Sequence, residues 1–159
     1  MPNRFVSSIV ICLLAAGCLP AQAVDWPAYQ RAFIAADGRV RDPLQNAASH
    51  SEGQGYGLLL AEMNADRPAF DRILKWTTDN LQVRRDALLA WSWGRRPNGD
   101  WNVIDYNNAS DGDILVAFAL LMAAQRWDHP PYRAVAQRIA QDIRRGEVVI
   151  VFDPKGDAD

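Results

Sequence analysis

One carboxylate stands inside a glycine-rich stretch near the start of the chain. The stretch S-E-G-Q-G-Y-G occupies residues 51–57 and runs directly into three leucines. Glycines allow a bulky ligand to approach the backbone closely, which makes Glu52 a candidate acid held against a substrate. A second interpretation stays open, because Ser51 and Gln54 also have the spacing of a helix capping box. In that case the stretch does no more than begin a helix.

A second polar cluster, N-N-A-S-D-G-D, occupies residues 107–113 and leads into an apolar run. Asp111 and Asp113 are its carboxylates, and Asn108 supplies one of its amides. The structural alternative has Ser110 capping a helix, with Asp113 completing a capping box and the helix dipole favouring both acids. An Asp-x-Asp pair can bind a cation, but a calcium loop needs more oxygen ligands than this one offers. No metal ion and no other cofactor is therefore expected.

Aromatic side chains are the third candidate feature, since sugars commonly stack on flat rings. Trp91 and Trp93 lie in an alternating segment, which would direct both to the same side. They could be stacking platforms or ordinary packing residues. Tyr56 could line a cleft or belong to the core. His50, next to Glu52, is interpreted as an exposed loop residue and not as a catalytic partner.

Helical periodicity dominates the elements that must position these residues. An amphipathic helix is expected from Asp25 to Asp37-Gly38, and the loop from Arg39 to Ser49 has no clear period. The stretch 94–100 is expected to be a polar loop. Helices that are amphipathic alternate with helices that are apolar all round, as two concentric layers require. Four further helices are expected at 51–64, at 70–81, from 111 onwards, and at 132–143.

Residues 1–23 have the pattern of an export signal, with Arg4, an apolar stretch and a small-x-small site ending at Ala23. The alternative is a lipoprotein signal in which Cys18 carries the lipid. Both cysteines, Cys12 and Cys18, lie in this segment, so the mature chain is expected to have no disulfide or thiol nucleophile. Residues 24–159 are long enough for one domain.

The charge balance and the end of the chain bound the function further. Seventeen Lys and Arg face nineteen Asp and Glu, with no basic patch that would suit nucleic acid. A neutral polymer or a small molecule is the more natural partner.

Residues 148–152 form an apolar β-branched run that needs a partner strand, followed by a turn-like ending. We interpret the chain as part of a larger fold.

The two polar clusters also carry a family resemblance. The string A-S-D-G-D-I-L-V-A-F-A-L-L-M-A-A-Q-R-W, residues 109–127, resembles the signature of glycoside hydrolase family 8, with Val116 as a mild departure. The stretch S-E-G-Q-G-Y-G is similar to the family's other hallmark and precedes it in the expected order. The W-x-W-G segment fits as well. Nearly all of the mature chain resembles the periplasmic endoglucanases that accompany bacterial cellulose synthesis.

This resemblance implies an all-α fold, an (α/α)₆ barrel of which the chain has about the first half. It implies hydrolysis of β-1,4-glucan (cellulose) with inversion, and a periplasmic or secreted location after removal of the signal. Glu52 matches the family's general acid, and Asp111 its active-site aspartate, which would polarise the sugar at the cleavage point. The cellulose synthase machinery becomes an expected partner. The implied substrate-binding residues are Trp91, Trp93, Tyr56 and Asn108.

Length is the chief departure from the family pattern. Twelve helices need well over 300 residues, about twice what this chain offers. The family's general base is an aspartate in the second half, and no residue here matches it. We therefore expect the isolated chain to have little or no glucanase activity. The competing hypotheses are a non-catalytic periplasmic glucan-binding or scaffold protein and an unrelated helical interaction domain.

Overall fold

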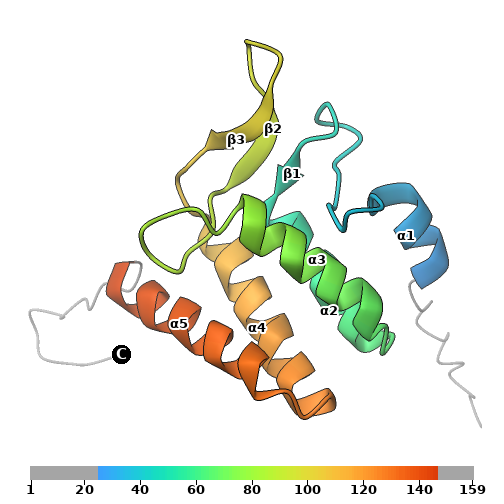
Figure 1. Ribbon diagram of the computed structural model, residues 1–159, viewed down its shortest axis with the longest axis vertical. Helices are drawn as coiled ribbons and strands as arrows, with labels where there is room; N and C mark the ends of the chain where they lie inside the picture. The colour runs from blue at the N-terminus through green and yellow to red at the C-terminus, as the bar shows by residue number, and fades with distance from the viewer. Residues whose placement is uncertain (1–24, 147–159) are drawn as a thin grey trace, which may run out of the picture.

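The computed structural model describes residues 25–146, so the segment predicted to be an export signal and the run at 148–152 lie outside the described residues. Within this range the chain forms five helices and three short strands (Figure 1). In chain order they are α1 (Trp26–Phe33), β1 (Ser49–His50), α2 (Ser51–Met63), α3 (Arg67–Asn80), β2 (Ser92–Arg95), β3 (Trp101–Asp105), α4 (Ser110–Arg126) and α5 (Pro130–Gly146). The predicted helix-dominated fold is confirmed.

Two helical hairpins make up the body of the molecule. Helices α2 and α3 form one hairpin, α4 and α5 form the other, and α2 packs directly against α4 (Figure 1). The mostly apolar α2 and α4 thus form an inner pair. The amphipathic α3 and α5 each cover one member of it, as the alternation of helix types predicts.

Helix α1 is attached to α3 through a shared carboxylate. Asp66, the N-cap of α3, accepts a hydrogen bond from its own helix at Ala69 N. The other oxygen of Asp66 accepts from the Trp26 indole at 3.0 Å and from the Gln30 amide at 3.1 Å. Helix α1 ends at Phe33, earlier than predicted, because Ile34 forms an antiparallel bridge with Val40.

The capping box predicted for α2 is wrong. His50 occupies the N-cap position without a side-chain cap, and Ser51 is a buried residue inside the first turn. Gln54 instead points into the core, where it accepts from Val40 N at 2.6 Å and donates to Thr77 Oγ1 at 2.7 Å. A buried amide that joins a loop to a neighbouring helix satisfies groups that would otherwise be costly to bury.

The glycines of residues 51–57 serve helix packing more than ligand access. A Cβ added at Gly55 would lie 2.6 Å from Leu115 Cβ on α4, and one at Gly57 would lie 2.7 Å from the Val40 side chain. Only at Gly53 is there ordinary room, with Val40 3.9 Å away. The space beside Gly55 and Gly57, which the sequence analysis left open to a substrate, is therefore filled by other side chains of the protein.

A three-stranded antiparallel sheet, in the order β1-β2-β3, stands at one end of the helices (Figure 1). The segment predicted as a polar loop at 94–100 is in part a hairpin, because Arg95 pairs with Trp101 in the β2–β3 ladder. The turn includes Gly99 at φ +93°, a conformation that glycine adopts at little cost. This hairpin projects from the helices and carries several aromatic side chains.

The core lies between the four long helices, with Leu58, Phe70 and Leu120 fully buried in it. Helix α4 is buried on one side only. Phe118 is 51 % exposed, and three further apolar residues on the same helix are at least 38 % exposed: Ile114, Leu121 and Met122. Among the described residues, no other element covers this apolar side of α4.

Candidate active site

Glu52 lies in the first turn of α2, just after the strand that leads into it. Residues Ser49 and His50 pair with β2, and Ser51 N donates to the carbonyl oxygen of Trp91 at 3.0 Å. These bonds fix the start of the helix against the sheet. The Glu52 side chain is half-buried, so it can reach a ligand at this end of the molecule.

Asp111 lies in the first turn of α4 and is exposed. Its Oδ1 accepts a hydrogen bond from Gly112 N at 2.8 Å. The predicted Ser110 cap is wrong, because Ala109 occupies the N-cap position and no side chain caps the helix. Negative charge at a helix N-terminus is favoured by the helix dipole.

Gly112 brings the two candidate residues to the same place. A Cβ added at Gly112 would lie 2.2 Å from Ser51 Oγ and 2.9 Å from the backbone nitrogen of Glu52. The first turns of α2 and α4 are therefore in direct contact. Glu52 begins at that contact and Asp111 immediately precedes it, so the structure unites two motifs that lie about sixty residues apart in the sequence.

Asp113 is a fully buried carboxylate directly beneath this contact. It accepts a hydrogen bond from Leu89 N at 2.8 Å and one from the Asn108 amide at 3.3 Å. The predicted capping-box role is wrong, whereas the alternative role of supporting the site agrees with these bonds. Asn108 is half-buried and oriented by Asp113, and its role in substrate binding stays a prediction.

The two tryptophans of the W-x-W-G segment have different surroundings. Trp91 is 43 % exposed and packs on His50 with 5.5 Å between ring centroids. Trp93 is half-buried between Trp76 and Trp101, at 5.3 Å from each. Trp91 lies outside β2, which begins at Ser92, so strand alternation does not direct both rings to one side. Trp91 thus has the open surface that a stacking platform needs.

Tyr56 follows Glu52 by four residues on α2, so both lie on one face of the helix. It is 48 % exposed, which contradicts the alternative that Tyr56 belongs to the core. The interpretation of His50 as an exposed loop residue is wrong. His50 is half-buried in β1 and lines a pocket together with Trp91.

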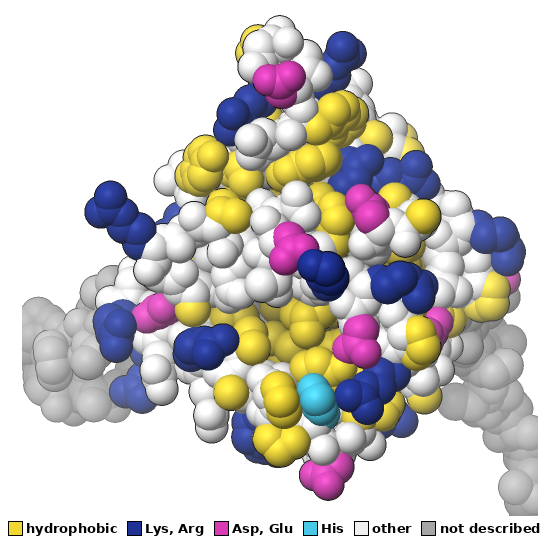
Figure 2. Space-filling view, in the orientation of Figure 1, with side chains coloured by type: hydrophobic (Ala, Val, Ile, Leu, Met, Phe, Trp, Pro, Cys, Tyr) yellow, Lys and Arg dark blue, Asp and Glu magenta, His cyan; other side chains and the backbone are white. Residues whose placement is uncertain are grey.

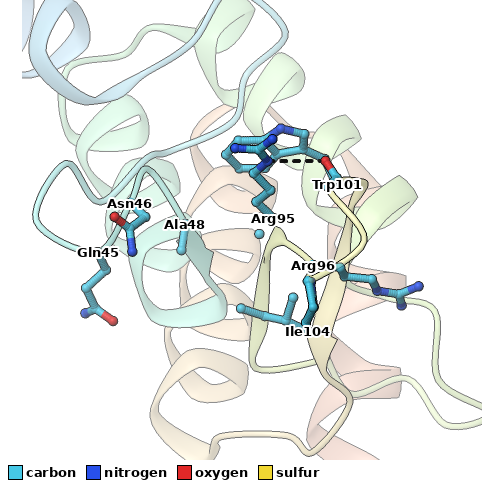
Figure 3. Close-up of a pocket in the computed structure, with 10 residues that line it drawn as sticks. Gln45, Asn46, Ala48, Arg95, Arg96, Trp101 and Ile104 are labelled. Atoms are coloured by element: carbon cyan, nitrogen blue, oxygen red, sulfur yellow. Dashed lines mark hydrogen bonds between the residues drawn. The ribbon is translucent and has the colours of Figure 1, made fainter.

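That pocket is one of two that join along the sheet. One has a volume of about 580 Å³ and is lined by His50, Trp91 and Asp105. The other, of about 820 Å³, lies between the loop carrying Gln45 and Asn46 and the β2–β3 hairpin (Figure 3). Both volumes are typical of ligand sites. The sequence did not identify three of the residues that line these pockets: Trp101, Gln45 and Asn46. The Asn98-Gly99 dipeptide is a hairpin signal that could have placed Trp101.

Residues 25–146 contain no group of three or more His, Cys, Asp or Glu side chains that could hold a metal ion. Within the same range, none of the helices has both the length and the apolar character required to cross a membrane.

The sequence of this chain is similar to those of known proteins. The family model for glycosyl hydrolases family 8 matches residues 2–157. An endoglucanase from Escherichia coli is 40 % identical over 155 residues, which are 94 % of this chain and 42 % of the relative. An endoglucanase from Xanthomonas axonopodis pv. citri is 43 % identical over 147 residues, which are 87 % of this chain and 38 % of that protein.

The fold of this chain is also similar to a solved structure. The crystal structure of a family 8 endoglucanase from Klebsiella pneumoniae superimposes with a TM-score of 0.74 at 38 % identity, covering 79 % of this chain and 40 % of the other. The chain therefore spans about two fifths of the length of the proteins it matches. Because the family model covers almost the whole sequence, the chain belongs to glycosyl hydrolase family 8.

Proposed function

We propose that this chain supplies the acid side of the catalytic centre of an endo-β-1,4-glucanase that works with inversion. The observation that carries the proposal is the contact of Gly112 with Ser51 and Glu52, which places Glu52 and Asp111 at one end of two packed helices. The endoglucanase names of the relatives support β-1,4-glucan as the substrate. The exposed ring of Trp91, which packs on the residue before Ser51 and Glu52 in the chain, supports a polysaccharide ligand.

In this proposal Glu52 donates its proton to the glycosidic oxygen as the bond from that oxygen to the anomeric carbon breaks. Asp111 stabilises the positive charge that develops on the sugar. Water attacks the opposite face of the ring, so the acid and the general base must stand about 6.5–9.5 Å apart. The family resemblance assigns that base to a second half of the fold, and we expect the isolated chain to release few or no reducing ends from carboxymethylcellulose.

A chimera tests the role of Glu52. Residues 24–159 of this chain would replace the matching part of the Escherichia coli endoglucanase, and release of reducing ends from carboxymethylcellulose would be measured. We expect activity in the chimera and a fall in kcat of about 10²–10⁴-fold for Glu52→Gln. Asp79→Asn, an exposed carboxylate on α3, is the control and should have no effect.

A second substrate makes this test specific to proton donation. An aryl cellobioside with a strongly acidic phenol as leaving group needs little protonation when its bond breaks. The loss caused by Glu52→Gln should therefore be much smaller on this substrate than on carboxymethylcellulose. Equal losses on both substrates would show that Glu52 does not act as the general acid.

We further propose that the protein is exported to the periplasm and works beside the cellulose synthase machinery. The signal pattern of residues 1–23 and the family resemblance support this location. Cell fractionation with an antibody against the chain would test it. The rival function, a non-catalytic glucan-binding protein, predicts that the isolated chain is folded and monodisperse and binds glucan without hydrolysing it.

A further inference from the structure

A cleft extends from His50 and Trp91 to the β2–β3 hairpin. The pocket beside His50 and Trp91 shares Gln45, Asn46, Ala48 and Ile104 with the larger pocket beside the hairpin. The two pockets are therefore one continuous cleft. One end lies directly before Glu52 in the chain, and the other is lined by Arg95 and Trp101.

Trp101 is held as a fixed surface on the hairpin side of the cleft. Trp93 stacks on it at 29° between ring planes, and the Arg39 guanidinium carbon lies 5.0 Å from the centroid of each ring. Trp101 remains 42 % exposed and lines the cleft. An aromatic ring that is already immobilised binds a ligand with little further loss of entropy. Figure 2 shows hydrophobic side chains at the surface over this hairpin, with basic side chains beside them.

Amide side chains stand on the opposite side. Gln45 and Asn46 lie on the loop that faces the hairpin (Figure 3). Asn46 and Ala47 have φ angles of +53° and +56°, and Asp42 accepts a hydrogen bond from Leu44 N at 2.8 Å. An antiparallel bridge between Asp42 and Ala48 closes this loop. Amides can both donate to and accept from hydroxyl groups.

The charge of the cleft fits a neutral ligand better than an anionic one. Arg96 lines the larger pocket, but its guanidinium donates to Val103 O and to the Tyr106 hydroxyl, and it extends away from Gln45 and Asn46 (Figure 3). Arg95 lines the same end and donates to Gly99 O at 3.4 Å, and Asp105 stands at the other end. A flat aromatic surface opposite amides matches a sugar, which has apolar faces and hydroxyl groups around its edge.

We propose that this cleft binds a further stretch of the glucan chain, with Trp101 as stacking platform and Asn46 as hydroxyl partner. The proposal rests on the proposed function, because it names glucan as the ligand. It adds a binding region remote from Glu52, so the enzyme would hold a segment of polymer beyond the cleavage point.

Calorimetric titration of the chain with cellohexaose tests the proposal. We expect Trp101→Ala to lower the affinity at least about tenfold and Trp101→Phe to retain part of it. Asn46→Gly removes the amide and keeps the positive φ accessible, and should weaken binding about fivefold. Met63→Ala, at the far end of α2, is the control and should bind as the parent chain does.

A spectroscopic measurement covers the case in which a variant does not fold. In the parent chain, cellohexaose should shift the indole N–H resonances of Trp101 and Trp91 and leave that of the buried Trp26 in place. No binding to the parent chain, no shift at Trp101, or unchanged affinity in folded Trp101→Ala would each overturn the proposal. This titration measures binding to the chain, whereas the chimera measures hydrolysis, so failure of the one is distinguishable from failure of the other.

Discussion

At the scale of single residues, the catalytic proposal depends on how closely two helices approach each other. Ser51 and Gly112 are the residues in contact, and the buried Ser51 hydroxyl has no hydrogen-bond partner among residues 25–146. A glycine at position 112 costs helix stability, because glycine loses more backbone freedom on folding than alanine does. In return, the missing side chain of Gly112 allows the two helices to approach closely, so that Glu52 and Asp111 lie at the same end of the helix pair.

Replacement of Gly112 by alanine should therefore destabilise the chain, although alanine favours helices. The new Cβ would lie 2.7 Å from Ser51 Cβ and 2.9 Å from Glu52 N, so backbone must move. We expect a loss of about 1–3 kcal/mol in the free energy of unfolding, measured by urea denaturation. Adding Ser51→Gly should restore only part of it, because the contact with the Glu52 backbone remains.

Gly53→Ala is the matched control for Gly112→Ala. Gly53 lies in α2, and a Cβ added there would be 3.9 Å from the Val40 side chain, within ordinary contact. We expect unchanged or slightly increased stability, by up to about 1 kcal/mol. Similar destabilisation by both substitutions would show that the tight contact at Gly112 is not what matters.

At the scale of elements, Asp66 connects α1 to α3. Burial by itself raises the pKa of this carboxyl, but hydrogen bonds from Ala69 N, the Trp26 indole and the Gln30 amide outweigh it. The pKa is thereby lowered from its ordinary value of 3.8. A lowered pKa in the folded state means that ionised Asp66 stabilises the fold above the unfolded value, and that this stabilisation is lost as the pH falls through the folded value.

Asp66→Asn should accordingly destabilise the chain at pH 7 more than at pH 3. The measurement is urea denaturation of both proteins at the two pH values. Asp128→Asn is the control, because Asp128 is exposed and its φ of +45° suits asparagine. An Asp66→Asn effect of equal size at both pH values would contradict the lowered pKa.

The sequence predicts the elements better than it predicts their contacts. Helices α3 and α5 follow from apolar periodicity, because each buries one face and exposes the other. Helices α2 and α4 follow from their continuous apolar runs. The β2–β3 hairpin was missed because Arg95 to Asp100 is polar and its strands are short. The stacking of Arg39 on Trp93 and Trp101 could not be inferred, since it joins segments more than fifty residues apart.

At the scale of the whole molecule, one side of the inner helix pair has no neighbour among residues 25–146. Phe118, Ile114, Leu121 and Met122 form this surface on α4. The chain spans about two fifths of its relatives, for example 42 % of the Escherichia coli endoglucanase. Exposed apolar surface of this extent is uncommon in a soluble monomer and favours association.

We expect the purified chain to self-associate as its concentration rises, as measured by sedimentation velocity. The double substitution Ile114→Gln and Phe118→Gln should reduce the association, because it places polar groups in the middle of the apolar surface. Leu44→Gln is the control: Leu44 is 93 % exposed but lies on the loop, away from α4. A parent chain that stays monomeric at all concentrations would contradict this expectation.

Arg39 has a consequence for how relatives of this protein should be compared. Its guanidinium donates to Ala47 O behind one wall of the cleft and stacks on the two indoles behind the other. Arg39 thus connects the two walls of the cleft, although it lines neither pocket. If the cleft binds glucan as proposed, two family members with identical cleft surfaces should differ in the glucan they accept when this hidden position differs between them.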